Sequence, residues 1–235
     1  DFVVKFAQKE ESKVDPVEPA VEGVDLTILY EQDNSMINTY TLLGVNPKAP
    51  FVDADGKAVA DVKLNTKGAE ALINWMLSDE GKDAAKNYGY KEYGEYLFYL
   101  LDNAPTSKAE IPMATEETKN IRMSTTTSVN DSGLLGYLLP IFEQKYGYKV
   151  EVFSAGTGKA INNAKMGNAD LIMVHAKAQE ETFVKDGFSY VLDGFDAERL
   201  SFMYNYFVLC GPSADPAGAK KAADVKAAFK AIADG

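Results

Sequence analysis

The chain has 235 residues, enough to bury a large core as one two-lobed protein or as two small domains. Hydrophobic residues make up 46% of it, but no apolar run approaches the roughly 20 residues of a membrane span, so the sequence predicts a globular protein without a transmembrane helix. The net charge of −11 and the presence of only two arginines, Arg122 and Arg199, argue against nucleic-acid binding, which needs clustered basic side chains.

Acidic residues concentrate in the first half of the chain. Residues 1–119 hold 12 Lys against 22 Asp and Glu, a net charge of −10, whereas residues 120–235 hold 12 basic against 13 acidic residues, a net charge of −1. An anion would therefore meet less repulsion in the second half, although local dipoles set the field close to a site. The single cysteine, Cys210, excludes an intramolecular disulfide, and its apolar neighbours predict a buried strand thiol rather than a nucleophile.

The first hundred residues predict strands followed by helices. Residues 1–22 show no period and favour a tether or a loosely held edge, and strands are predicted at 24–29 and 38–47. Asp53-Ala54-Asp55-Gly56 indicates a hairpin turn, because it lacks the ligand spacing of a calcium loop. Amphipathic helices are predicted over 66–77 and from Ser78 through Tyr88.

A tyrosine-rich stretch and a polar linker separate this region from the second half. The tyrosines of residues 88–98 have no arginine or basic groove beside them, so we expect them to pack rather than to stack on bases. Residues 102–119 are polar and contain two prolines, which predicts a linker.

From residue 120 onward, strands and helices alternate. The predicted order is strand 120–126, helix 132–146, strand 149–154, helix 158–166, strand 170–174, helix 177–186, strand 202–210 and helix 221–233. Such alternation predicts an α/β fold with a mostly parallel sheet covered by helices on both faces. Ligands of such sheets bind at the carboxyl ends of the strands.

A run of five hydroxyl residues, Ser124 to Ser128, closes the first of these strands. Cap-type residues and an amphipathic run follow it, which predicts a helix start. A hydroxyl-rich turn at a helix N-terminus suits an anion, because backbone N–H groups and hydroxyls donate hydrogen bonds there without a counter-charge. An ordinary Ser/Thr-rich loop remains the alternative.

A second motif, Ser154-Ala155-Gly156-Thr157-Gly158-Lys159-Ala160, follows the next strand in the same way. It matches neither the phosphate-binding loop nor the dinucleotide fingerprint. Because both loops would lie on the same edge of a parallel sheet, we predict one ligand site with Lys159 supplying a long-range positive charge. The candidate ligand-binding residues are Thr126, Thr127, Ser128, Ala155, Gly156 and Thr157.

These residues resemble the tungstate- and molybdate-type oxyanion-binding proteins that serve ABC importers. The resemblance in the second half rests, in family order, on Thr125-Thr126-Thr127-Ser128, Asp131-Ser132-Gly133-Leu134-Leu135, Gly156-Thr157-Gly158-Lys159-Ala160, Gly167-Asn168-Ala169-Asp170, Val174-His175-Ala176 and Tyr204-Asn205-Tyr206-Phe207-Val208. It implies a periplasmic-binding-protein-like fold of type II with two lobes, an oxyanion ligand, an ABC permease as partner, and an extracytoplasmic location. No cofactor and no metal are implied.

The order of the segments departs from that of the family. Residues 23–101 resemble the family's C-terminal portion, through motifs such as Trp75-Met76-Leu77-Ser78-Asp79-Glu80-Gly81, yet they precede residues 120–235, which resemble its N-terminal portion. The family's Arg-Gly-Asp-x-Ser-Gly-Thr stretch and middle segment are absent, so its arginine has no counterpart here and the second lobe is expected to be incomplete. A circular permutation, or the tail of one domain joined to the head of the next in a tandem array, would each explain this order. A swapped or neighbouring copy would then supply the missing part.

Three functions remain open on these residues. The first is capture of a tetrahedral oxyanion, tungstate or molybdate before others, for ABC-type import, without enzymatic activity. The second is a scaffold module of this fold that no longer binds solute. The third is a hydrolase that uses His175, the only histidine, with Ser128 or Cys210 as nucleophile, but the sequence has no Gly-x-Ser-x-Gly elbow.

Overall fold

The computed structural model describes residues 26–234, so the predicted tether at 1–22 lies outside the described residues. The chain divides into two compact units. We call residues 39–88 and 98–203 the sheet unit, and the described residues 26–38, 89–97 and 204–234 the terminal unit. No helix of the described residues has the length and apolar character needed to cross a membrane.

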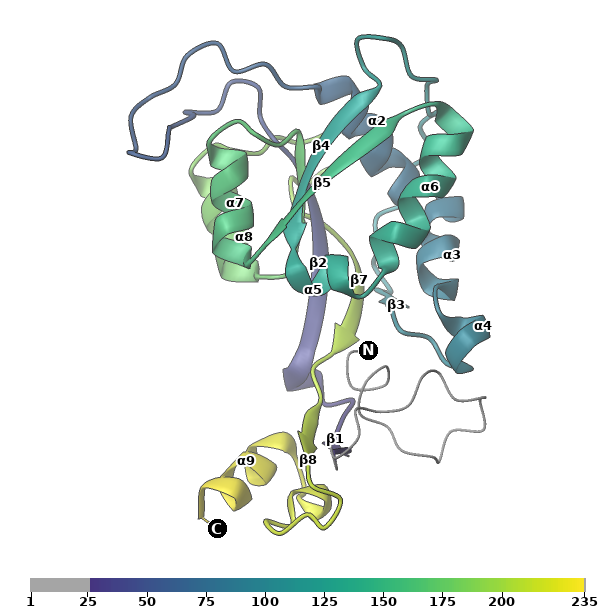
Figure 1. The fold of residues 1–235 in the computed structure, drawn as a ribbon, viewed down its shortest axis with the longest axis vertical. Coiled ribbons are helices and arrows are strands. Elements are labelled where there is room, and N and C mark those ends of the chain that lie inside the picture. The colour runs from purple at the N-terminus through teal and green to yellow at the C-terminus, as the bar shows by residue number, and fades with distance from the viewer. Residues whose placement is uncertain (1–25, 235) are drawn as a thin grey trace. The chain divides into compact units, whose positions relative to one another are not determined.

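A six-stranded sheet forms the centre of the sheet unit, in the order β3-β7-β2-β6-β4-β5 (Figure 1). Its strands are β2 (Ile37–Gly44), β3 (Tyr99–Leu100), β4 (Asn120–Thr126), β5 (Lys149–Ala155), β6 (Leu171–Val174) and β7 (Leu200–Tyr206). Strand β4 pairs in parallel with both β5 and β6, whereas β2 pairs antiparallel with β6. The α/β class is confirmed. The sheet is mixed, because β2, which comes from the first half of the chain, runs antiparallel to β6.

Helices cover both faces of this sheet (Figure 1). On one face lie α7 (Thr157–Lys165) and α8 (Lys177–Lys185), and on the other lie α2 (Thr66–Met76), α3 (Asp79–Asn87) and α6 (Leu134–Tyr146). The predicted starts of α2 and α3 follow from their caps, since Asn65 accepts the N–H of Gly68 and Ser78 accepts the N–H of Gly81.

Each face of the sheet has an apolar core. On the α7 and α8 side, Leu43, Ile172 and Val174 of the strands pack with Phe183 and Phe188. On the other side, the fully buried rings of Trp75 and Phe142 lie 5.5 Å apart between centroids. The two cores fix the strands between two helical layers and so hold the strand ends in place.

The predicted linker at 102–119 forms no helix or strand. It is nevertheless held along the helices, because Ser107 donates its N–H to the carbonyl of Leu77 and Ala114 donates its N–H to the carbonyl of Tyr146.

The predicted turn at Asp53 forms as well. Its side chain accepts the N–H groups of Asp55 and Lys57.

Two features of the second half differ from the prediction. The helix predicted over 132–146 forms as α6, but a short helix that was not predicted, α5 (Thr127–Asp131), precedes it, and Gly133 separates the two with φ +83°, a left-handed conformation. The strand predicted over 202–210 is two strands, β7 and β8 (Leu209–Gly211), because residues 207–208 leave the ladder.

In the terminal unit, β8 pairs antiparallel with β1 (Thr27–Tyr30). The small core of this unit contains Leu29, Ala219 and Ala228. The other described elements of the unit are η1 (Asn34–Met36), α4 (Tyr90–Tyr93), η2 (Ala219–Lys221) and α9 (Val225–Asp234). The helix predicted over 221–233 thus begins later, at Val225. Cys210 is on a strand as predicted but is only half-buried.

Candidate functional site

Strands β4, β5 and β6 end at one edge of the sheet, which we call the carboxyl edge. Thr126, the last residue of β4, lies opposite Ala155, the last residue of β5, and Thr125 lies opposite Met173 of β6. Strand β4 is followed by α5, β5 by α7, and β6 by residues 175–176, which lead into α8. The structure therefore brings all six candidate residues together at the carboxyl edge.

The first two residues of the hydroxyl run bond to the backbone of other elements, whereas the last two are exposed. The hydroxyl of Ser124 donates to the carbonyl of Ala160 and that of Thr125 to the carbonyl of Met173, and both residues are fully buried. Thr126, Thr127 and Ser128 make no such bond to the backbone of another element in the described part of the chain. Thr127 and Ser128 are exposed, so their hydroxyls are available to a ligand.

Backbone donors add to these hydroxyls. Helix α7 begins at Thr157, and no side chain caps it at Gly156 in the described structure. The N–H groups of a first helical turn have no partner within the helix, so those of α7 remain available at the carboxyl edge. A Cβ added at Gly156 or Gly158 would meet no atom within 4 Å, so no neighbouring group packs against either glycine on that side.

Two further side chains at this edge were not predicted as part of the site. The Nε2 atom of His175 lies 2.7 Å from Ser128 Oγ, and Ser128 Oγ in turn lies 3.2 Å from Thr126 Oγ1. The hydroxyl of Ser154, one residue before Ala155, is buried and has no hydrogen-bond partner among the described atoms. The position of His175 directly after an apolar strand was the sequence signal that could have placed it at the carboxyl edge.

The local environment keeps His175 neutral. Burial lowers its pKa below the usual value, while a hydrogen bond with its own backbone and the carboxylate of Glu180 act in the opposite direction. The ring packs against Tyr40, with 5.4 Å between the ring centroids. The site thus combines hydroxyls, amides and a neutral imidazole, with no carboxylate bonded to the imidazole among the described residues.

Positive charge at this edge comes from lysine and not from arginine. Lys159, in the first turn of α7, is exposed and forms no ion pair within the described residues. Arg199 is bonded to the buried carboxylate of Glu180. Arg122 lies near the start of β4, away from its carboxyl end, so neither arginine donates to the hydroxyl cluster.

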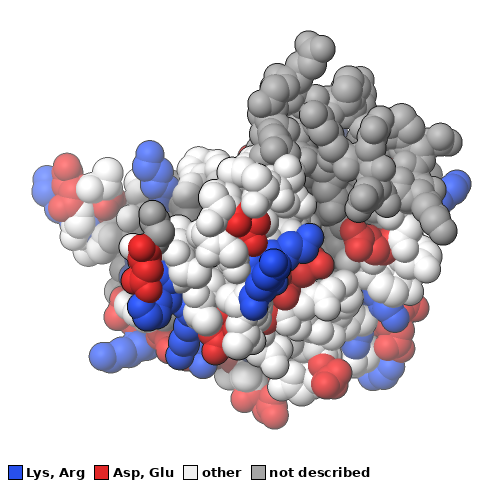
Figure 2. Space-filling view, turned by 90° about the horizontal axis from the view of Figure 1, so that it is seen from below, with Lys and Arg blue, Asp and Glu red and all other residues white. Residues whose placement is uncertain are grey.

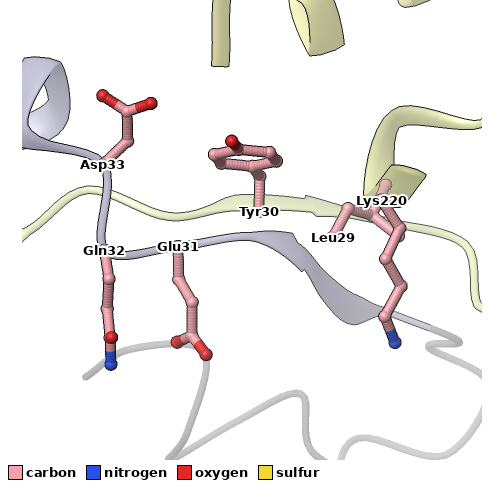
Figure 3. A pocket seen from close by; sticks show the side chains of 6 residues that line it. All are labelled: Leu29, Tyr30, Glu31, Gln32, Asp33 and Lys220. Carbon is pink, nitrogen blue, oxygen red and sulfur yellow. The ribbon is translucent and has the colours of Figure 1, made fainter. Parts of the chain in front are cut away.

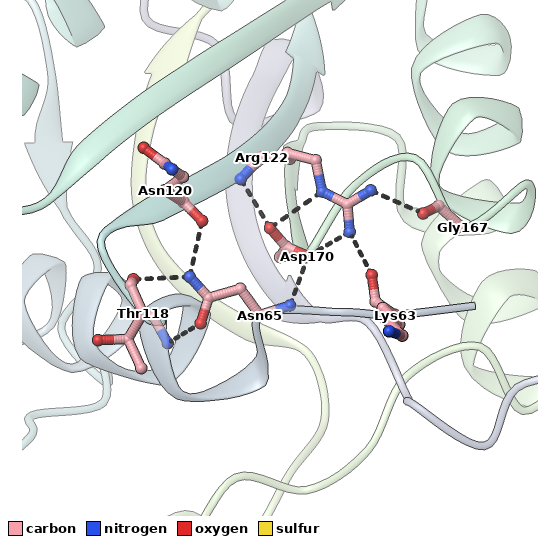
Figure 4. Close-up of polar contacts among 8 residues, drawn as sticks. Lys63, Asn65, Thr118, Asn120, Arg122, Gly167 and Asp170 are labelled. Atoms are coloured by element: carbon pink, nitrogen blue, oxygen red, sulfur yellow. Dashed lines mark hydrogen bonds and ion pairs between the residues drawn. The ribbon is translucent and has the colours of Figure 1, made fainter. Parts of the chain in front are cut away.

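Arg122 instead holds the opposite ends of the strands together (Figure 4). Its guanidinium donates to Asp170, with 2.6 Å between Nη2 and Oδ1, and to the carbonyls of Gly167 and Lys63. Asp170 is fully buried and also accepts the N–H of Asn65 at 2.8 Å. These bonds join β4, the start of β6 and the cap of α2, which indicates a structural role.

A cavity in the terminal unit is a poorer match to an anion. It is an open pocket with a volume of about 310 Å³, lined by Leu29, Tyr30, Glu31, Gln32, Asp33 and Lys220. Figure 3 shows the side chains of Glu31 and Asp33 pointing to opposite sides of the chain, and Asp33 Oδ1 accepts bonds from Ser35. Two carboxylates against one lysine would repel an anion.

The surface charge distribution agrees with the sequence argument on nucleic acids. On the face seen in Figure 2, the described Lys and Arg side chains stand among Asp and Glu side chains and form no continuous basic area. A phosphate backbone would find no basic stripe on that face.

An α/β unit that gathers hydroxyls and uncapped amides at the carboxyl edge of its sheet has the architecture of a ligand-binding domain suited to anions. The model of the PBP superfamily domain matches residues 113–235, just over half of the chain. The chain belongs to that family.

Two curated relatives are similar to about half of the chain. A putative ABC transporter anion-binding protein of Haloferax volcanii is 41% identical over 117 residues, which are 50% of this chain and 32% of the relative. The tungstate-binding protein TupA of Peptoclostridium acidaminophilum is 43% identical over 122 residues, which are 51% of this chain and 40% of the relative. The chain therefore spans less than half the length of these relatives.

Among solved structures, the tungstate ABC transporter from Geobacter sulfurreducens is 44% identical, with a TM-score of 0.43, over 49% of this chain and 47% of that one. The tungstate-binding protein TupA from Desulfovibrio alaskensis is 30% identical, with a TM-score of 0.38, over 49% of this chain and 43% of that one.

Proposed function

We propose that this chain captures a tetrahedral oxyanion, tungstate or molybdate before others, at the carboxyl edge of its sheet unit. The observation that carries the proposal is the pairing of Thr126 with Ala155, which sets the exposed hydroxyls of Thr127 and Ser128 at the same edge as the uncapped amides of α7. Hydrogen bonds to an ionised acceptor are stronger than neutral ones, so uncharged donors are sufficient to hold an anion. Relatives that bind tungstate or other anions support the same ligand class.

In this proposal the chain is a transport protein and not an enzyme. It would work outside the cytoplasm and hand the anion to an ABC permease, as expected for the solute-binding class that its relatives' names describe. The Ser128–His175 pair has the geometry of a nucleophile and base. A hydrolase, however, also needs a group that orients the base, and the nearby Glu180 is bonded to Ala176 and Arg199 instead.

Isothermal titration calorimetry with tungstate, molybdate, sulfate and phosphate tests the proposal. We expect binding of at least one of these, and a loss of about tenfold to a hundredfold in affinity for Ser128→Ala or Thr127→Ala, since a hydrogen bond to a charged group contributes about 1.5–3 kcal/mol. Thr182→Ala is the matched control, because this exposed hydroxyl bonds only within α8. Silence with all four anions would favour the scaffold function, and an equal loss in the control would contradict the placement of the site at the carboxyl edge.

A further inference from the structure

The only histidine of the chain is in direct contact with a residue of the proposed anion site. His175 Nε2 lies 2.7 Å from Ser128 Oγ, although the two residues follow different strands. The imidazole is half-buried against the ring of Tyr40, whereas Ser128 is exposed. The ring is thus held on one side by packing and presents Nε2 to the serine hydroxyl.

A serine hydroxyl has one hydrogen, so this contact exists in two forms with opposite consequences for an anion. When Ser128 donates to an unprotonated Nε2, it offers an anion only its lone pairs, and these repel negative charge. When Nε2 carries a hydrogen and donates to Oγ, the serine hydrogen is free to point at the anion.

We propose that His175 is a positioning residue of the anion site: its Nε2–H donates to Ser128 Oγ and so turns the serine hydrogen toward the bound oxyanion. This inference rests on the proposed function, because it concerns the same site. It assigns to His175 a role in binding that requires no contact with the ligand.

The charges around the ring decide which protonation state takes this role. From α8, Glu180 faces the ring and favours its protonated form, but Arg199 is bonded to that carboxylate. From β2, the phenol ring of Tyr40 packs against it, and from α5 Ser128 is its hydrogen-bond partner. In the free protein, burial outweighs these effects and lowers the pKa of His175.

The imidazolium is the form that both keeps the backbone hydrogen bond of the ring and donates to Ser128. A bound anion favours this form, so it raises the pKa of His175 and binding takes up a proton. Affinity should therefore increase as the pH falls from the pKa of the anion-bound form to the lower pKa of the free protein, and level off below it. The increase amounts to a factor of about ten for each unit by which the anion raises the pKa.

Nitrogen-15 NMR gives a direct test, because the single histidine produces the only imidazole signals of the chain. We would titrate the full chain with acid in the presence and absence of tungstate and follow both ring nitrogens. The expected result is a higher pKa with tungstate and a shift of the Nε2 signal toward the protonated form. An unchanged pKa and unchanged signals, with binding heat present, would overturn the inference alone.

Calorimetry across about pH 5.5 to 8, the range in which histidine titrates, provides the second readout. His175→Gln keeps an amide donor that does not titrate, so it should bind tungstate with an affinity that no longer depends on pH. Lys177→Gln, a change of exposed charge two residues away, should retain the pH dependence. Equal pH dependence in the His175→Gln variant and the parent would contradict the inference, whereas absence of binding heat in the parent would overturn the proposed function with it.

Discussion

Single residues at the two ends of β4 have separate tasks. At its carboxyl end Ser128 remains exposed for a ligand, whereas near its start Arg122 bonds to the fully buried Asp170. A buried carboxylate that accepts a guanidinium and two backbone N–H groups cannot be removed by substitution without leaving donors unpaired. The stability of the sheet unit should thus depend on Asp170 and not on the ligand-site hydroxyls.

We expect Asp170→Asn to lower the free energy of unfolding by about 3 kcal/mol, because it breaks a buried ion pair from one side. Asp186→Asn removes the more exposed partner of Lys165 and should cost less than about 1 kcal/mol. Urea denaturation of both variants at neutral pH measures the difference. Similar losses for the two variants would show that the Arg122 cluster contributes no more than a surface pair.

At the scale of elements, one glycine decides where a helix ends. Gly133 separates α5 from α6 with φ +83°, and a Cβ there would lie 2.4 Å from the hydroxyl oxygen of Tyr88. That hydroxyl donates to the carbonyl of Ser132, so it closes the same turn. The break sets the direction in which α5 leaves the carboxyl edge.

Gly133→Ala should therefore destabilise the chain more than Gly187→Ala. Both positions have a left-handed backbone, which costs a residue with a Cβ about 1–2 kcal/mol, but a Cβ at Gly187 would meet no atom within 4 Å. The midpoints of thermal unfolding, compared by circular dichroism, report the additional cost at Gly133. A larger loss for the Gly187 variant would contradict the assignment of Tyr88 as the limiting contact.

At the scale of the whole molecule, the first and second halves of the sequence share one sheet. Strand β2 from the first half is hydrogen-bonded to β6 from the second, and Asn65 from the first half bonds to Asp170. We propose that the described parts of residues 23–101 and 120–235 fold together within one chain, as in a circular permutation. In a tandem array, the two segments would belong to different copies of the domain.

A disulfide between β2 and β6 distinguishes these arrangements. Thr41 and Val174 are Cα partners, a spacing that suits a disulfide. In a Thr41→Cys, Val174→Cys and Cys210→Ser variant, we expect oxidative refolding to give cross-linked monomers on a non-reducing gel. A variant that keeps only Thr41→Cys and Cys210→Ser is the control, and disulfide-linked dimers of the double cysteine variant would support a swapped or tandem arrangement.

The sequence by itself determined most elements and the edge of the sheet at which the candidate residues lie. Strand β4 has the bounds that were predicted, and α2, α3, α6, β5, α7, β6 and α8 lie within a few residues of their predicted bounds, because local periodicity and caps fix such elements. The Thr126–Ser128 and Ala155–Thr157 loops, predicted to share an edge, do share it. Helix α5 escaped prediction because the hydroxyl run shows no helical period, and the break before β8 escaped it because it does not interrupt the apolar pattern.

Only the tertiary structure decided which polar groups remain free for a ligand. Ser124 and Thr125 look the same as Ser128 in the sequence, yet their hydroxyls donate to carbonyls 36 and 48 residues away. The hydrogen-bond partners of His175 and Arg122 lie 47 and 48 residues away in the sequence, and Glu180, the partner of Arg199, lies 19 residues away. Hydrogen-bond partners of side chains depend on the register of strands that meet only when the chain folds, so local pattern carries no information about them.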